Sequence, residues 1–174
     1  RSRIGMHFLR GSCGAVGNAC FFWTITSMVL ADSMALQFSR PLFMMPLALL
    51  FLGERAGWRR YTVTLIGFIG ILFYARPFTD GFQPAAFIGA TGALFGGLVV
   101  LGIKSLAKTE PTRVIMFYYG IWNTLFALGP ALFLWVTPSV PELALLLVVG
   151  FLGIVGQSMI THGFTQGEIG RAHV

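Results

Sequence analysis

Residues 85–103, AAFIGATGALFGGLVVLGI, form an apolar run that is interrupted only by Thr91 and holds no charged side chain. Its length is close to the roughly 20 residues with which an α-helix crosses the hydrocarbon core of a bilayer. The run lacks the period-two alternation of a barrel strand. A helix also satisfies every backbone polar group within lipid. This run therefore predicts a transmembrane helix.

The whole chain has the composition of a membrane protein. Of its 174 residues, 56% are hydrophobic and 10% are charged, whereas a soluble domain carries about 25% charged residues. The net charge is +6, but the basic residues stand at the ends of apolar runs and form no stripe with interleaved aromatics, so nucleic acid is not an expected partner. Two cysteines, Cys13 and Cys20, and three histidines give no zinc or iron-sulfur pattern, and we expect neither a metal nor a cofactor.

Six runs have a length suited to spanning helices, and the sequence predicts an all-α integral membrane protein. The runs are Gly11–Leu30, Ala35–Leu52, Tyr61–Ala75, Ala85–Ile103, Val114–Val136 and Leu143–Ile160. If the chain crosses at each run, Arg76 falls on one side of the membrane. Arg40 falls within a run, and every other Lys and Arg falls on the opposite side, including Arg10, Arg59 and Lys104. The positive-inside rule then places the N-terminus and the 53–60 and 104–113 connections in the cytoplasm.

Several motifs resemble the EamA-type repeats of the drug/metabolite transporter superfamily. They are TSMVLADSMALQFSRPLF (26–43), LALLFLGERAGWRR (47–60) and GFIGILFYARP (67–77) for a first repeat, and TEPTRVIMFYYG (109–120) and GFLGIVGQSMITHGFTQGE (150–168) for a second. The resemblance implies a ten-helix bundle of two five-helix inverted repeats that moves small organic solutes. On that template the chain is similar to helices three to eight, which implies a fragment, as the start on Arg1 also suggests.

The resemblance divides the chain into parts of two repeats. Residues 1–77 are expected to hold three helices of the first repeat, 78–84 an external loop, and 85–168 three helices of the second. A shift of 136 residues places Gly14 and Gly17 opposite Gly150 and Gly153, a weak match of the kind that inverted repeats give. The tail 169–174 resembles a translated sequencing adaptor and is expected to be non-native.

Arg40 is the most informative polar position. It lies about 13 Å into its span at 1.5 Å per residue, close to the bilayer midplane. An arginine at that depth is costly and normally faces a cavity or a partner. Pro41 and Pro46 allow the helix to kink or open, and Gln37 shares a helix face with Arg40. We expect Arg40 to bind an anionic group of the solute or a partner in a gating step, with Gln37 on the same path; the alternative is a structural arginine that bonds backbone carbonyls freed by Pro41.

Other polar or aromatic side chains within the predicted spans are candidates for solute binding. Solute sites in membranes combine apolar walls with a few convergent polar groups, and aromatic rings stack on a ring or a quaternary amine. An interfacial anchor or simple packing is the alternative for the aromatic residues. The candidates are Asn18, Tyr118, Trp122, Asn123 and Gln157.

The sequence therefore predicts a secondary transporter of a small organic metabolite that works by alternating access at a midplane site. The bacterial inner membrane is the expected location, with lipid and solute as partners; a coupling proton and a homodimer are left open. A non-transporting accessory membrane subunit is the alternative. No nucleophile and base pair at membrane depth supports an enzyme.

Overall fold

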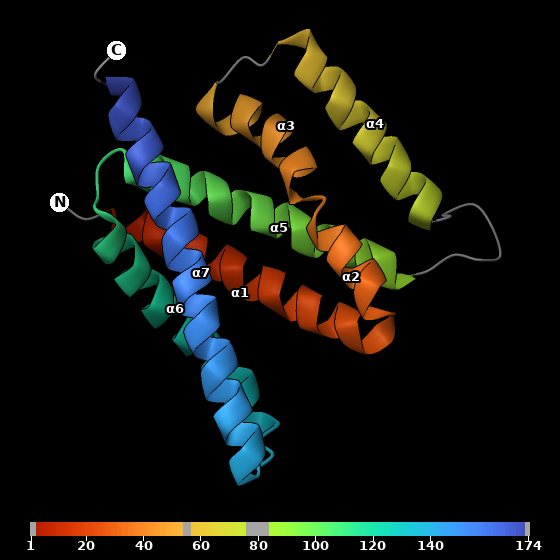
Figure 1. Ribbon diagram of the computed structural model, residues 1–174, viewed down its shortest axis with the longest axis vertical. Coiled ribbons are helices and arrows are strands. Elements are labelled where there is room, and N and C mark those ends of the chain that lie inside the picture. The colour runs from red at the N-terminus through yellow and green to blue at the C-terminus, as the bar shows by residue number, and fades with distance from the viewer. Residues whose placement is uncertain (1–2, 54–56, 76–83, 173–174) are drawn as a thin grey trace. The chain divides into compact units, whose positions relative to one another are not determined.

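The computed structural model describes residues 3–53, 57–75 and 84–172, and every regular element within them is a helix. The helices are α1 (Ile4–Ser27), α2 (Leu30–Gln37), α3 (Arg40–Leu52), α4 (Trp58–Ala75), α5 (Pro84–Ala107), α6 (Thr112–Phe133) and α7 (Val140–Ala172) (Figure 1). The predicted all-α class is confirmed. Arg76 and most of the predicted loop 78–84 lie outside the described residues, as do the last two residues of the tail.

Four stretches are long and apolar enough to cross a bilayer within the described part of the chain. They are Leu30–Phe51, Pro84–Ala107, Thr112–Phe133 and Val140–Gln166, and Tyr61–Phe73 is a shorter apolar helix. These five correspond to the last five of the predicted runs. The first predicted run, Gly11–Leu30, covers most of α1 but continues past its end at Ser27 to the first residue of α2, and α1 is not among the four.

The second predicted span is broken into two helices. Pro41 has no amide hydrogen and its ring crowds the carbonyl of Gln37, so α2 ends at Gln37 and α3 begins with Pro41 in its first turn. The Ser39 amide donates to the Leu36 carbonyl at 3.1 Å, and the Ser39 hydroxyl donates to the same carbonyl at 2.5 Å. The predicted continuous helix is thus wrong at Phe38 and Ser39, whereas the predicted opening near Pro41 is confirmed. Gly53, with φ of 64°, ends α3 in the left-handed conformation.

Helix ends differ from the predicted ones for identifiable reasons. The first helix begins at Ile4 rather than Gly11, because His7 and Arg10 find partners within the fold, as described below. Helix α6 ends at Phe133 rather than Val136, shortly before Pro138, which disfavours helix in the residue that precedes it. At the start of α7 the Glu142 carboxylate accepts hydrogen bonds from the Ser139 amide and hydroxyl, both at 2.7 Å.

The chain forms two compact units. Unit 1 comprises residues 1–12 and 102–174, and unit 2 comprises residues 13–101. In unit 1, α6 and α7 pack side by side (Figure 1), and Ile103, Leu106 and Ile115 are fully buried. In unit 2, α3 packs on α4, and Leu36 and Ala86 form a small core.

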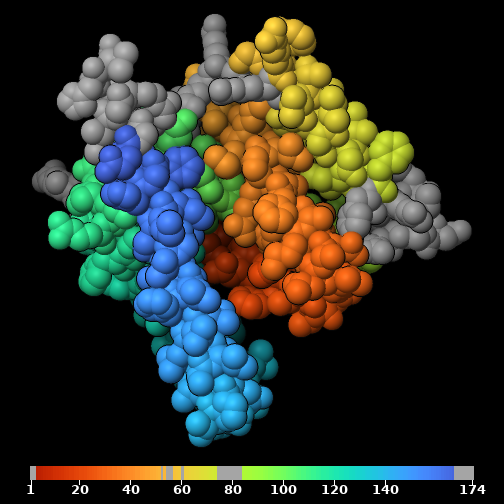
Figure 2. Space-filling model, in the orientation of Figure 1, coloured from red at the N-terminus to blue at the C-terminus, as the bar shows by residue number. Residues whose placement is uncertain are grey.

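The first half of α7 leaves its apolar side chains uncovered. Leu145, Leu147 and Phe151 are each about two-thirds exposed, and Figure 2 shows this segment in light blue. Such a surface is unfavourable in water and is suited to contact with lipid or with further apolar helices.

Candidate solute-binding site

The structure brings Arg40 and Gln37 together at the break between α2 and α3. The Arg40 Nε donates to the Gln37 Oε1 at 2.7 Å, and the Arg40 Nη2 donates to the same oxygen. Both side chains belong to unit 2. The helix break leaves Arg40 at the N-terminus of α3 as an exposed residue.

Two glycines of α5 make room for this pair. A Cβ placed on Gly96 would lie 2.7 Å from the Arg40 Nε, and one on Gly92 would lie 3.7 Å from the Gln37 Nε2. Gly92 also faces Gly17 of α1, whose carbonyl would lie 3.4 Å from that added Cβ. The small residues of α5 thus allow the α1 backbone and the Arg40 side chain to approach the helix closely.

Asn18 lies next to this contact on α1, with its side chain exposed. Within the described residues, no hydrogen bond joins Asn18 to Gln37 or Arg40. Of the predicted site residues in unit 2, Arg40 and Gln37 therefore form a pair, and Asn18 stays separate from it.

The other predicted residues belong to unit 1, where two of them pack against α1. The Tyr118 ring stacks on the His7 ring with centroids 4.5 Å apart. The Trp122 ring meets the Phe8 ring edge to face at 4.9 Å. A Cβ added to Gly11 would lie 2.3 Å from the Trp122 Cβ, so the two helices touch there. Asn123 on α6 and Gln157 on α7 are half-buried.

Sequence reasoning assigned Arg10 to membrane orientation, but the structure buries it. The Arg10 side chain is 2% exposed, its Nη1 donates to the Ile115 carbonyl at 3.4 Å, and its guanidinium carbon lies 4.1 Å from the centre of the Tyr119 ring. Gly102 leaves space for the aliphatic part, because an added Cβ would lie 3.3 Å from the Arg10 Cβ. The available signal was the spacing of His7 and Arg10, which places both on one helix face.

His7 forms a buried contact with Glu110 that the sequence did not predict. Its Nε2 lies 2.6 Å from the Glu110 Oε2, and the Arg3 amide donates to the Glu110 Oε1 at 2.8 Å. Partial burial raises the pKa of the Glu110 carboxyl, but the hydrogen bonds from Arg3 and His7 outweigh burial and lower that pKa below its usual range. Glu110 lies between α5 and α6, and its two contacts hold the start of α1 to this connection.

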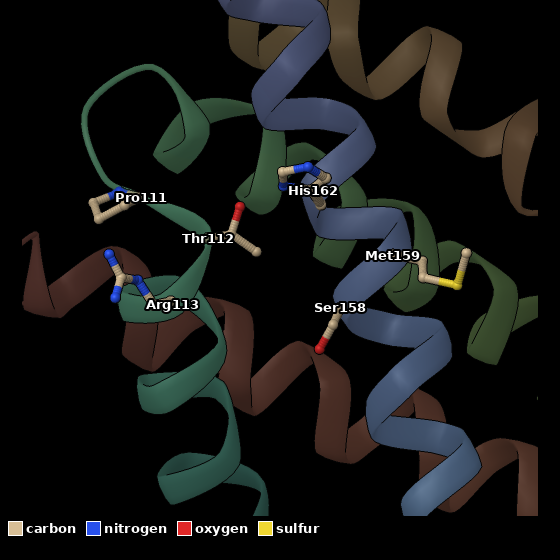
Figure 3. A pocket seen from close by; sticks show the side chains of 6 residues that line it. All are labelled: Pro111, Thr112, Arg113, Ser158, Met159 and His162. Carbon is tan, nitrogen blue, oxygen red and sulfur yellow. The ribbon is translucent and has the colours of Figure 1, made fainter.

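A shallow cavity of about 520 Å³ opens between the start of α6 and the second half of α7. Figure 3 shows Thr112 and His162 pointing toward one another across it, with Ser158 below. Pro111, Arg113 and Met159 complete its lining. None of the predicted site residues lines this cavity. Within the described residues, no group of three His, Cys, Asp or Glu side chains could hold a metal ion.

Comparison with known proteins shows that the chain is similar to membrane transporters. Residues 2–76 match the EamA-like transporter family, and curated transporters align over most of the chain. The chain is therefore similar to this family of transporters.

The individual relatives are transporters of different solutes. The chain is 33% identical to the S-adenosylmethionine uptake transporter of Rickettsia felis over 87% of its own length and 52% of the relative. It is 30% identical to the pseudopaline exporter of Pseudomonas aeruginosa, over 95% and 59% of the two chains. It is 30% identical to the riboflavin transporter of Rhizobium johnstonii, over 93% and 54%. The chain thus spans about half the length of the curated relatives it matches, and no solved structure gives a significant match.

Proposed function

We propose that the chain is part of a secondary transporter that moves a small organic metabolite across the bacterial inner membrane by alternating access. The observation that supports this most is the interrupted span of α2 and α3, with Arg40 at the break. Transporters of this kind place solute sites at discontinuous helices near the bilayer midplane. The names of the relatives, an uptake transporter and an exporter among them, support a small solute and leave the direction of transport open.

In this proposal Arg40 recognises an anionic group of the solute. Gln37 holds the guanidinium through the Oε1 atom, and Gly96 lets the side chain lie against α5. An arginine that is placed in advance loses less conformational freedom when a carboxylate or phosphate binds. Asn18, Tyr118, Trp122, Asn123 and Gln157 remain candidates for the rest of the solute path, and Arg10 is considered separately below.

Contacts within unit 1 support the proposal that successive helices cross the membrane in opposite directions. The Arg3 amide bonds Glu110, and the Thr112 and Thr165 hydroxyls lie 2.9 Å apart. The start of α1, the connection between α5 and α6, and the second half of α7 therefore share one end of the unit. This is the end that the basic residues assign to the cytoplasm. The same proposal includes a coupling proton and a second copy of the chain as partners.

The test is uptake into proteoliposomes that contain the complete protein, with a panel of radiolabelled anionic, neutral and cationic metabolites. Arg40→Gln is expected to lower uptake of the transported anion at least tenfold, because a charge-assisted bond is lost. Arg40→Lys is expected to keep part of the activity. Arg59→Gln removes an exposed cation at the start of α4 and serves as the matched control. Unaltered uptake in both Arg40 variants, at normal expression, would remove the binding role of Arg40; uptake of no member of the panel would count against transport itself.

A further inference from the structure

The buried polar atoms that lack a hydrogen-bond partner within the described residues all belong to unit 1. They are the Arg10 Nε and Nη2, the Trp122 Nε1 and the His7 Nδ1. His7 and Arg10 lie one turn apart on α1, where the Tyr118 ring stacks on His7 and the Tyr119 ring lies under the Arg10 guanidinium. The Trp122 ring packs on Phe8. Native proteins leave few buried polar groups unpaired, and each unpaired group calls for an explanation.

The unpaired atoms of Arg10 have a geometry suited to one kind of ligand. The Nε–H and the adjacent Nη2–H point in parallel from one edge of the planar guanidinium, and this edge binds both oxygens of a carboxylate. The Nη1 on the other side is already used by the Ile115 carbonyl. The side-on edge is therefore the part of Arg10 that remains for a ligand.

Glu110, the acidic residue that contacts His7, does not pair with Arg10. Glu110 receives the His7 ring and the Arg3 amide, and it forms no ion pair with Arg10 within the described residues. The Trp122 Nε1–H is a donor only, so it cannot pair with the Arg10 donors. A buried charge without an acceptor is costly, and Arg10 fits an acceptor that comes from outside these residues.

We propose that Arg10 binds a carboxylate of the transported solute through its Nε and Nη2, with the Tyr119 ring against the face of the guanidinium. This inference rests on the proposed transport function, because it names a chemical class of solute. Arg10 is closed off from solvent in this conformation. The solute reaches it when the helices rearrange during alternating access.

The experiment observes the Arg10 Nε–H directly by NMR of the complete protein, labelled with ¹⁵N-arginine, in lipid nanodiscs. Cyclohexanecarboxylate is the probe, cyclohexanecarboxamide its uncharged counterpart, and inorganic phosphate a second anion. The carboxylate is expected to shift the Arg10 signal saturably, with no effect of the carboxamide at the same concentration and weaker binding of phosphate. The Arg113 signal, from an exposed arginine of the same unit, is expected to stay unchanged.

A matched pair of variants separates binding from packing. Arg10→Lys keeps the charge without the fork and is expected to weaken carboxylate inhibition of transport at least tenfold, whereas Arg113→Lys is not.

The results distinguish this inference from the transport proposal. If the carboxylate gives no saturable shift, or the carboxamide or phosphate binds as well, the inference is overturned and the Arg10 donors are hydrated, even if the protein transports. If the carboxylate binds as expected but no solute crosses the membrane, the carboxylate site stands and the transport proposal fails.

Discussion

Arg10 and Arg40 are two arginines in apolar helices that solve the problem of a charge in opposite ways. Arg40 lies at a helix break in unit 2, exposed, with two of its nitrogens donating to Gln37. Arg10 lies within the unbroken α1 in unit 1, 2% exposed, with an aromatic ring against its face and two nitrogens that have no partner within the described residues. The helix break at Pro41 leaves Arg40 exposed, and close packing of helices encloses Arg10. The two arginines therefore differ in the hydrogen-bond partners that the fold gives them. Their positions along the apolar runs of the sequence do not reveal this difference.

The largest expected effect on stability comes from the different packing around Gly11 in unit 1 and Gly96 in unit 2. Gly11→Ala in unit 1 would bring a Cβ to 2.3 Å from the Trp122 Cβ, an atom fixed to its backbone, so the helices must move apart. We expect a loss of about 3 kcal/mol in the free energy of unfolding, at the upper end of overpacking costs. Gly96→Ala in unit 2 meets the Arg40 Nε and Cδ, near the end of a flexible side chain. For that change we expect a loss of under about 1 kcal/mol and a clear decrease in transport, because the guanidinium is displaced.

Thermal unfolding in nanodiscs, read by the loss of helical circular dichroism, measures both changes. Gly5→Ala is the matched control on α1, since nothing lies within 4 Å of an added Cβ there. It is expected to leave stability unchanged or to raise it slightly, because alanine favours helix. Equal losses for Gly11→Ala and Gly96→Ala would contradict the comparison of the two units.

The next largest effect is the pH dependence of stability that we expect from Glu110, a residue of unit 1. A carboxyl whose pKa is lower in the folded protein stabilises the fold above its unfolded pKa of about 4.3, and this contribution is lost as the pH falls through the lower folded pKa. We expect Glu110→Gln to cost about 1 kcal/mol at pH 7. The difference from the parent protein should shrink as the pH is lowered toward 3.

Unfolding midpoints of both proteins between pH 3 and pH 7 measure this dependence. His7→Gln, alone and together with Glu110→Gln, completes a double-mutant cycle at pH 7, in which the two changes are expected to be non-additive because the side chains are 2.6 Å apart. A constant difference at every pH, or simple additivity, would show that the contact between His7 and Glu110 does not hold the start of α1.

The sequence predicts the all-helical class, most of the spans and the opening near Pro41, because apolar run length and proline chemistry are local properties. It pairs Gln37 with Arg40 for the same reason, since the two are three residues apart. It does not predict the His7–Glu110 pair or the burial of Arg10, which depend on segments that are about 100 residues apart in the chain. Position near a basic terminus made Arg10 resemble an orientation signal, and only the packing of α6 on α1 reveals a different environment.

The smallest expected effect compares the hydroxyl contacts between helices in the two units. In unit 1 the Thr165 hydroxyl donates to the His162 carbonyl at 2.8 Å, so the Thr112 hydroxyl is the donor in the 2.9 Å contact between α6 and α7. In unit 2 the Thr64 hydroxyl of α4 meets the Met45 sulfur of α3, a weaker acceptor, at 2.8 Å. A double-mutant cycle of Thr112→Val and Thr165→Val should give a coupling of about 0.6 kcal/mol, the average for such bonds in membranes. The cycle of Thr64→Val and Met45→Leu should give less. A larger coupling in unit 2 would reverse the ranking and place the stronger polar contact in the unit of Arg40 rather than in that of Arg10.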